Sequence, residues 1–171
     1  MKKFFYIIIT IIFMLSLTVC TQSKDTSKSN STAKKITGKI VKANLNDGGN
    51  IIIKTKDITT KAMYISYEYE GITIGLLAVR DSKNNVKVVV NTCQSCGGAP
   101  NAYFVQVGNK IQCQNCKNMF AIDELDNLED GGCNSIAIKD KKIQDGVITI
   151  DVEQLKELKD EFKNWNGPKH K

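Results

Sequence analysis

The sequence predicts a mainly β fold of the β-rich α+β class, a small antiparallel β domain that ends in an amphipathic helix. Two observations lead to this fold class. Short runs of β-branched and aromatic residues alternate with clusters of Gly, Asn and Asp from residue 36 onward, which is typical of strands joined by tight turns. Near the C-terminus the apolar spacing changes from that of a strand to that of a helix. At 171 residues the chain is long enough for one domain with a core of ordinary size.

The predicted strands follow one another closely along the chain. We expect strands at residues 36–43, 51–53, 63–69, 72–79, 86–90 and 147–150. Residues 46–50 and 81–85 are rich in Asn, Asp and Gly and mark turns, and Glu70-Gly71 marks a hairpin. Because each run is short and most are β-branched, strands are favoured over helices.

An amphipathic helix is predicted over residues 152–165. Asp151 occupies an N-cap position, and Gln154 follows where a capping side chain can reach back. The apolar stripe of the helix consists of Leu155, Leu158, Phe162 and Trp165. We interpret the stripe, its tryptophan included, as a packing face rather than a binding site. Gly167-Pro168 ends the helix.

Two CxxC pairs are the most specific feature of the sequence. The pairs are Cys93-x2-Cys96 and Cys113-x2-Cys116, with sixteen residues between them. A CxxC on a tight turn directs two thiolates at one point, and two such turns complete a tetrahedron of sulfur around zinc or iron. Residues 102–107 and 110–112 around Gly108-Asn109 predict a hairpin between the pairs. This turn, hairpin, turn order is the plan of a zinc ribbon or a rubredoxin-like site.

Cys133 adds a fifth sulfur, in the turn Gly131-Gly132-Cys133-Asn134. A structural zinc site does not need it, so it favours iron or redox chemistry. Two disulfides are an alternative, but CxxC disulfides are typically redox-active, and five cysteines cannot all pair. A thiol–disulfide oxidoreductase would want one CxxC opening a helix beside a βαβ unit, a context the sequence does not supply.

Residues 1–20 are predicted to be a lipoprotein-type signal peptide. Lys2 and Lys3 precede an uncharged run over 4–19, which is shorter than the roughly 20 residues of a membrane-spanning helix. The run ends at Cys20 before a polar stretch, which resembles the lipobox of bacterial lipoproteins, where the cysteine is lipidated and becomes the N-terminus. An uncleaved signal anchor is the alternative.

Both readings of the N-terminus place the rest of the chain at the extracytoplasmic face of the cell membrane. Residues 21–35 contain no large apolar side chain and predict a flexible polar tether. Residues 36–171 are then a single β-rich metal-binding domain. The membrane, through a lipid on Cys20 or a signal anchor, is the expected partner.

Charge and histidine content exclude other classes of function. The net charge of +6 forms no basic patch interleaved with aromatic residues, so nucleic-acid binding is not predicted. The single histidine, His170, stands one residue from the end, which argues against a histidine-containing catalytic zinc site or a Ser-His-Asp triad. We assign no catalytic residue and favour a metal-binding or electron-transfer protein over a catalyst.

A wider set of residues around the cysteines matches the pattern of a known family. Besides the five cysteines, the matching residues are Asn91, Thr92, Tyr103, Gly108, Asn109, Asn115, Phe120, Gly131, Gly132 and Asn134. Together with the predicted strands that precede Cys93, these residues make the stretch 57–140 resemble the membrane-associated iron–sulfur family related to FtrD, a component of bacterial iron-uptake systems. The multi-helix membrane part that often accompanies this module is not found in the sequence, so a permease is not expected.

The resemblance implies an extracytoplasmic module that binds metal or an Fe–S cluster and passes electrons for iron handling. The expected cofactor is iron or an Fe–S cluster, with zinc as the alternative, and the candidate ligands are Cys93, Cys96, Cys113, Cys116 and Cys133. A redox partner or iron-uptake components are the expected protein partners. A structural zinc-ribbon-like binding module and a thiol–disulfide oxidoreductase stay open as alternative functions.

Overall fold

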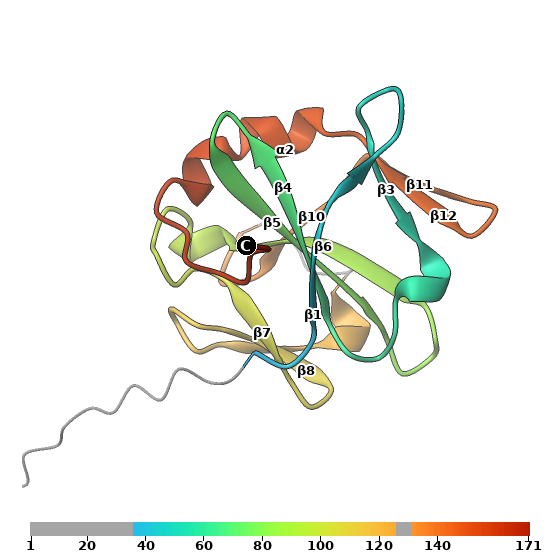
Figure 1. Cartoon of the computed structure of the whole chain (residues 1–171). Coiled ribbons are helices and arrows are strands. Elements are labelled where there is room, and N and C mark those ends of the chain that lie inside the picture. Colours follow the sequence, from blue (N-terminus) through green and yellow to red (C-terminus); the bar gives the residue numbers. More distant parts are fainter. Residues whose placement is uncertain (1–35, 126–130) are drawn as a thin grey trace, which may run out of the picture. The chain divides into compact units, whose positions relative to one another are not determined.

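The computed structural model describes residues 36–125 and 131–171, which form a β-rich domain (Figure 1). The predicted signal peptide at 1–20, with Cys20, and the predicted tether at 21–35 lie outside the described residues. In the part of the chain that is described, no helix is both long and apolar enough to cross a membrane. The mainly β fold class predicted from the sequence is confirmed.

The central sheet, sheet A, has the strand order β1-β4-β5-β6-β10. Its strands are β1 (Lys39–Lys42), β4 (Met63–Tyr69), β5 (Ile72–Arg80), β6 (Val86–Cys93) and β10 (Ser135–Ala137). β4, β5 and β6 form an antiparallel meander, and Glu70 and Gly71 turn the predicted hairpin with positive φ angles of 47° and 76°. β1 pairs with β4 in parallel, and β10 returns antiparallel beside β6.

Two smaller antiparallel sheets accompany sheet A. Sheet B contains, in order, β11 (Lys141–Gln144), β12 (Val147–Ile150), β3 (Ile51–Lys54) and β2 (Asn44–Leu45). Sheet C contains β7 (Phe104–Val107), β8 (Lys110–Cys113) and β9 (Met119–Ala121). The predicted strand at 36–43 contributes β1, and the chain then continues into β2 of another sheet. The sequence does not predict β11, because its residues are mostly polar and show no alternation.

Sheet A is buried on both faces, which explains the nearly continuous apolar runs of β5 and β6. Val88 and Val90 of β6 belong to a buried cluster shared with sheet B and the C-terminal segment. Val89 and Cys93 belong to a second cluster, shared with Phe104 of sheet C. Figure 1 shows β7 and β8 below the strands of sheet A and the C-terminal helix above them. Strand β6 therefore contributes side chains to both buried clusters, one on each face of sheet A.

The C-terminal helical segment lies within the predicted range 152–165 but is not one regular helix. A short α-helix, α2 (Glu153–Glu157), is followed by a 3-10 helix, η4 (Lys159–Phe162). The two meet at Leu158, whose carbonyl oxygen accepts a hydrogen bond from the Glu161 N–H at 3.0 Å. Such i to i+3 bonds wind the chain more tightly than an α-helix. The packing of Phe162 and Trp165 then determines the course of the chain more than helix propagation does.

Trp165 fixes this segment on sheet A, as the predicted packing face requires. Trp165 and Phe162 are 4% and 3% exposed, and their rings meet edge to face at 5.3 Å between centroids. The indole covers Gly75 of β5, where an added Cβ atom would lie 2.4 Å from the ring. Its Nε1 donates to the carbonyl oxygen of Asn91 at 3.1 Å, which ties the C-terminal segment to the strand that carries Cys93.

Replacing Gly75 with alanine tests this contact. The new methyl group would force the Trp165 ring away from β5, so Gly75→Ala is expected to lower the free energy of unfolding by about 1–3 kcal/mol. Gly48→Ala is the matched control, because its nearest neighbour, the Asn46 side chain, is 3.4 Å away. Denaturant unfolding of both variants measures the difference. Equal stability of the two variants would contradict the packing role of Trp165.

Candidate metal centre

Four cysteine thiols meet where the ends of β6 and β8 come together. Cys93 ends β6, Cys96 ends the 3-10 helix η2 (Gln94–Cys96), Cys113 ends β8, and Cys116 lies between β8 and β9. Their four Sγ atoms all lie within 4.8 Å of one another. These cysteines are free thiols in the structure. The predicted order of turn, hairpin and turn is therefore present, and it brings the two CxxC pairs face to face.

Each CxxC turn contains a residue in the left-handed region of φ. Gly98 has φ of 78° in the first turn, and Lys117 has φ of 66° in the second. The Ala99 N–H donates to the Cys96 carbonyl oxygen at 3.0 Å, and the Lys117 N–H donates to the Cys113 carbonyl oxygen at 3.0 Å. Both turns thus reverse the chain directly after a cysteine pair.

Hydrogen bonds from β6 hold the hairpin in place. The Cys93 N–H donates to the Ala102 carbonyl oxygen at 3.3 Å, and the Phe104 N–H donates to the Asn91 side-chain oxygen at 2.8 Å. Asn91 is 1% exposed. Sequence reasoning gives Asn91 no structural role, although an amide within a valine-rich strand is the signal that could have identified it.

Burial and hydrogen bonds shift the pKa values of Cys93 and Cys96 in opposite directions. Cys93 and Cys113 are fully buried, whereas Cys96 and Cys116 are partly exposed. Burial, together with the hydrogen bond between the Cys93 and Cys96 thiols, raises the pKa of Cys93. Burial also acts to raise the pKa of Cys96, but hydrogen bonds from Asn115 and the neighbouring thiols outweigh it and lower that pKa. Four thiolates this close need a cation to offset their charge.

Cys133 lies beside this group rather than within it. The N–H groups of Gln94 and Ser95 donate to carbonyl oxygens of residues 131–134, at 2.8 and 3.1 Å, and so hold that segment against the first CxxC turn. The Cys133 thiol forms a hydrogen bond with Cys116. The structure therefore gathers all five predicted thiols, with four of them mutually close and the fifth adjacent.

The donor set fits a single tetrahedral metal ion. A metal–sulfur bond of about 2.3 Å places the sulfurs of a tetrahedron roughly 3.8 Å apart. In the structure the Sγ atoms lie at most 4.8 Å from one another, which is about 1 Å more than that spacing, so small side-chain movements would complete the coordination. Zinc and iron both accept four thiolates in this geometry, and the same four sulfurs suit either metal.

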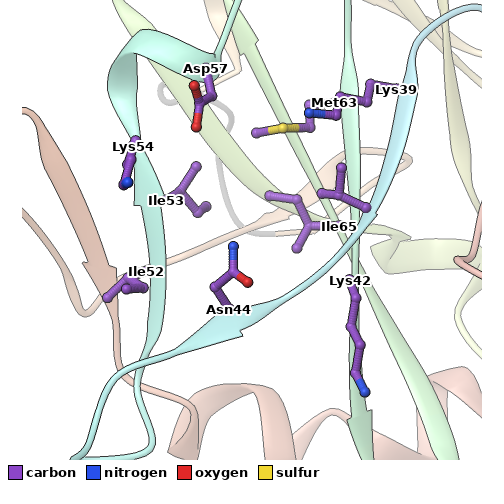
Figure 2. A pocket seen from close by; sticks show the side chains of 10 residues that line it. Lys39, Lys42, Asn44, Ile52, Ile53, Lys54, Asp57, Met63 and Ile65 are labelled. Carbon is purple, nitrogen blue, oxygen red and sulfur yellow. The ribbon is translucent and has the colours of Figure 1, made fainter.

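A separate hollow of about 300 Å³ opens between β1 and β3 (Figure 2). Its lining residues are Lys39, Val41, Lys42, Asn44, Ile52, Ile53, Lys54, Asp57, Met63 and Ile65. The hollow lies where the chain passes from sheet A to sheet B, and its floor consists of buried apolar side chains. None of its lining residues belongs to the cysteine group, so we treat it as a crevice between sheets.

The fold and the site together define a small β-rich protein with a four-cysteine centre of the metal-binding type. The chain belongs to the FtrD-like family, described as membrane iron-sulfur containing protein FtrD-like, whose family model matches residues 58–162. The resemblance predicted from residues 57–140 is thereby confirmed. The family description and the four sulfurs together indicate that the centre binds a metal or an iron–sulfur group.

Comparison with solved structures gives a weaker likeness. One match is the crystal structure of the quaternary ammonium Rieske monooxygenase CntA in complex with the inhibitor MMV12, at 17% sequence identity and a TM-score of 0.35. The match covers 53% of this chain and 27% of that one, so this chain spans about a quarter of that protein's length. No curated protein matches the chain.

The geometry predicts which cysteines retain metal. Cys113→Ser removes one of the four close sulfurs, and we expect it to lose at least tenfold in metal affinity, since a hydroxyl replaces a thiolate in a soft donor set. Cys133→Ser is the matched control and is expected to keep one equivalent of metal. Competition with a chromophoric chelator measures both affinities. Metal loss in Cys133→Ser would make Cys133 a required ligand and contradict the four-sulfur assignment.

Proposed function

We propose that this protein holds iron, as a single ion or an iron–sulfur group, at the extracytoplasmic face of the cell membrane and serves in electron transfer or iron handling. The observation that carries the proposal is the group of four Sγ atoms within 4.8 Å of one another. The ligands are Cys93, Cys96, Cys113 and Cys116, and Cys133 is a further sulfur beside them. Membership of a family described as iron–sulfur containing supports iron over zinc.

The surroundings of the centre suit electron exchange. Iron bound by thiolates supplies one-electron redox chemistry when it is present. Cys93 and Cys113 are fully buried, in a cluster with Phe104 and other apolar residues that excludes water. Cys96 and Cys116 are partly exposed, and they form the side of the centre that a redox partner can approach.

Two alternatives each rest on a specific observation. The four cysteines join the end of sheet A to sheet C, so a zinc ion would crosslink the two sheets and act as a structural element of a binding module. The Cys133 thiol hydrogen-bonds with Cys116, which favours a thiol–disulfide oxidoreductase, because two adjacent thiols can reduce a partner's disulfide to two thiols and become a disulfide themselves.

Attachment to the membrane forms a second part of the proposal. The family description names a membrane protein, which supports anchoring either by a lipid on Cys20 or by an uncleaved signal anchor. An anchor at this end of the chain would hold the iron centre near redox proteins or iron-uptake components of the same membrane. These are the partners that we propose.

Anaerobic isolation of the full chain in detergent tests the nature of the metal. We expect iron together with visible thiolate-to-iron charge-transfer bands, and both should be strongly reduced in Cys113→Ser. Elemental analysis and absorption spectra measure the two quantities on the same sample. A colourless chain with one equivalent of zinc would replace the iron proposal with the structural zinc alternative. Metal-free protein with reversible disulfides would favour the oxidoreductase.

Labelling with a fatty-acid analogue tests the anchor. The wild-type chain is expected to incorporate the analogue and to lose its first nineteen residues, because lipidation at Cys20 precedes cleavage. Cys20→Ala should incorporate none, and Cys133→Ala, which removes a cysteine elsewhere, should label normally. Gel fluorescence and mass spectrometry of the N-terminus report the result. An unlabelled wild-type chain that retains its first residues would show that the anchor is a signal sequence.

A further inference from the structure

Three buried polar atoms around Cys93 have no hydrogen-bond partner among the residues that the structure describes. They are Asn91 Nδ2, Thr92 Oγ1 and Ser135 Oγ. A buried polar group without a partner costs about 1–3 kcal/mol, so each such group calls for an explanation. All three lie near the end of β6 or at the start of β10, in the residues adjacent to Cys93 or paired with it.

Ser135 is the orphaned group that shares a face with Cys93. The two residues are the end pair in the antiparallel pairing of β10 with β6, next to a register shift between Ser135 and Ile136. Side chains of such partners lie on the same face of the sheet, with Cβ atoms about 4.5–5.5 Å apart. Ser135 is 2% exposed and Cys93 is fully buried, so water does not compete for the hydroxyl. No hydrogen bond within the described part of the chain holds the hydroxyl, so it can rotate towards the Cys93 sulfur.

Thr92 and Asn91 are placed differently. Successive residues of a strand point to opposite faces, so Thr92 shares its face with Val90, in the cluster on the far side of sheet A. Asn91 lies on the same face as Cys93, but its side chain is already held by the hydrogen bond that Phe104 donates to it. Ser135 is therefore the group that is free to respond to the charge of the sulfur.

The first CxxC turn has few other donors for Cys93. The N–H groups of Gln94 and Ser95, which directly follow this cysteine, are used by carbonyl oxygens of residues 131–134. The Cys96 N–H does donate to the Cys93 sulfur. A metal-bound thiolate in a buried site gains from each further donor, because hydrogen bonds offset part of its negative charge.

We propose that, in the metal-loaded protein, the Ser135 hydroxyl donates a hydrogen bond to the Cys93 thiolate and tunes the centre. The inference rests on the proposed function, since it needs a metal held by Cys93. Ser135 is a positioning residue and not a ligand. Its hydrogen bond stabilises the more negative, reduced state of an iron–thiolate centre, and so raises the reduction potential.

The test compares Ser135→Ala with Thr92→Val in the full chain loaded anaerobically with ferrous iron. Ser135→Ala is expected to bind iron as the wild type does but to shift its midpoint potential to a more negative value. At the potential where the wild type is half reduced, the ratio of reduced to oxidised iron should fall several-fold. Thr92→Val removes the orphaned hydroxyl on the opposite face and should leave the potential unchanged. Ser135→Thr keeps a hydroxyl and should restore the wild-type value.

A second measurement does not depend on redox activity. Loading the same variants with Co²⁺ gives thiolate-to-cobalt charge-transfer bands, which are expected to move to lower energy in Ser135→Ala alone, because the sulfur loses a hydrogen bond. Unchanged bands and an unchanged potential in Ser135→Ala would overturn the inference while leaving the metal centre intact. A wild-type chain that binds neither iron nor cobalt would instead overturn the proposed function, and this inference with it.

Discussion

The end of strand β6 is the constraint on which the rest of the domain depends. This strand carries Cys93 into the space between sheet A and sheet C while both of its faces stay buried. Three of its polar atoms near this end are paired from two other parts of the chain. Asn91 accepts one hydrogen bond from Phe104 and another from Trp165, and the Cys93 N–H donates to Ala102. Because a buried polar group without a partner costs free energy, these three hydrogen bonds help to hold sheet C and the C-terminal segment against β6, where the site forms.

The same burial governs the chemistry of the centre. Two of its four thiols have no contact with water, and all four are close enough for their negative charges to repel strongly once they ionise. In the structure they share hydrogen bonds that converge on Cys96. A bound metal ion would replace those protons, so metal binding and the docking of sheet C on sheet A are expected to stabilise each other. The free energy of unfolding and the metal affinity are then expected to change together.

Local patterns predicted the parts of the fold that are formed by neighbouring residues. The hairpin at Glu70-Gly71 and the one at Gly108-Asn109 follow from turn chemistry between β-branched runs. The helix over 152–165 is only partly regular, because packing on sheet A overrides the periodic pattern. Gln154 shows the same effect: its amide accepts from the Lys139 N–H and donates to the Ala137 carbonyl oxygen, where the sequence indicated a helix cap.

The sequence by itself determined the pairing of thiols within each CxxC turn, since a spacing of two residues fixes that geometry locally. It also determined the hairpin between the turns and the family. Only the tertiary structure decided that Cys133 lies beside the four sulfurs and that Ser135 faces Cys93, because β10 pairs with β6 across some forty residues of chain. That pairing joins two segments that are distant in the sequence, and it forms only when β10 packs beside β6, so local spacing does not encode it.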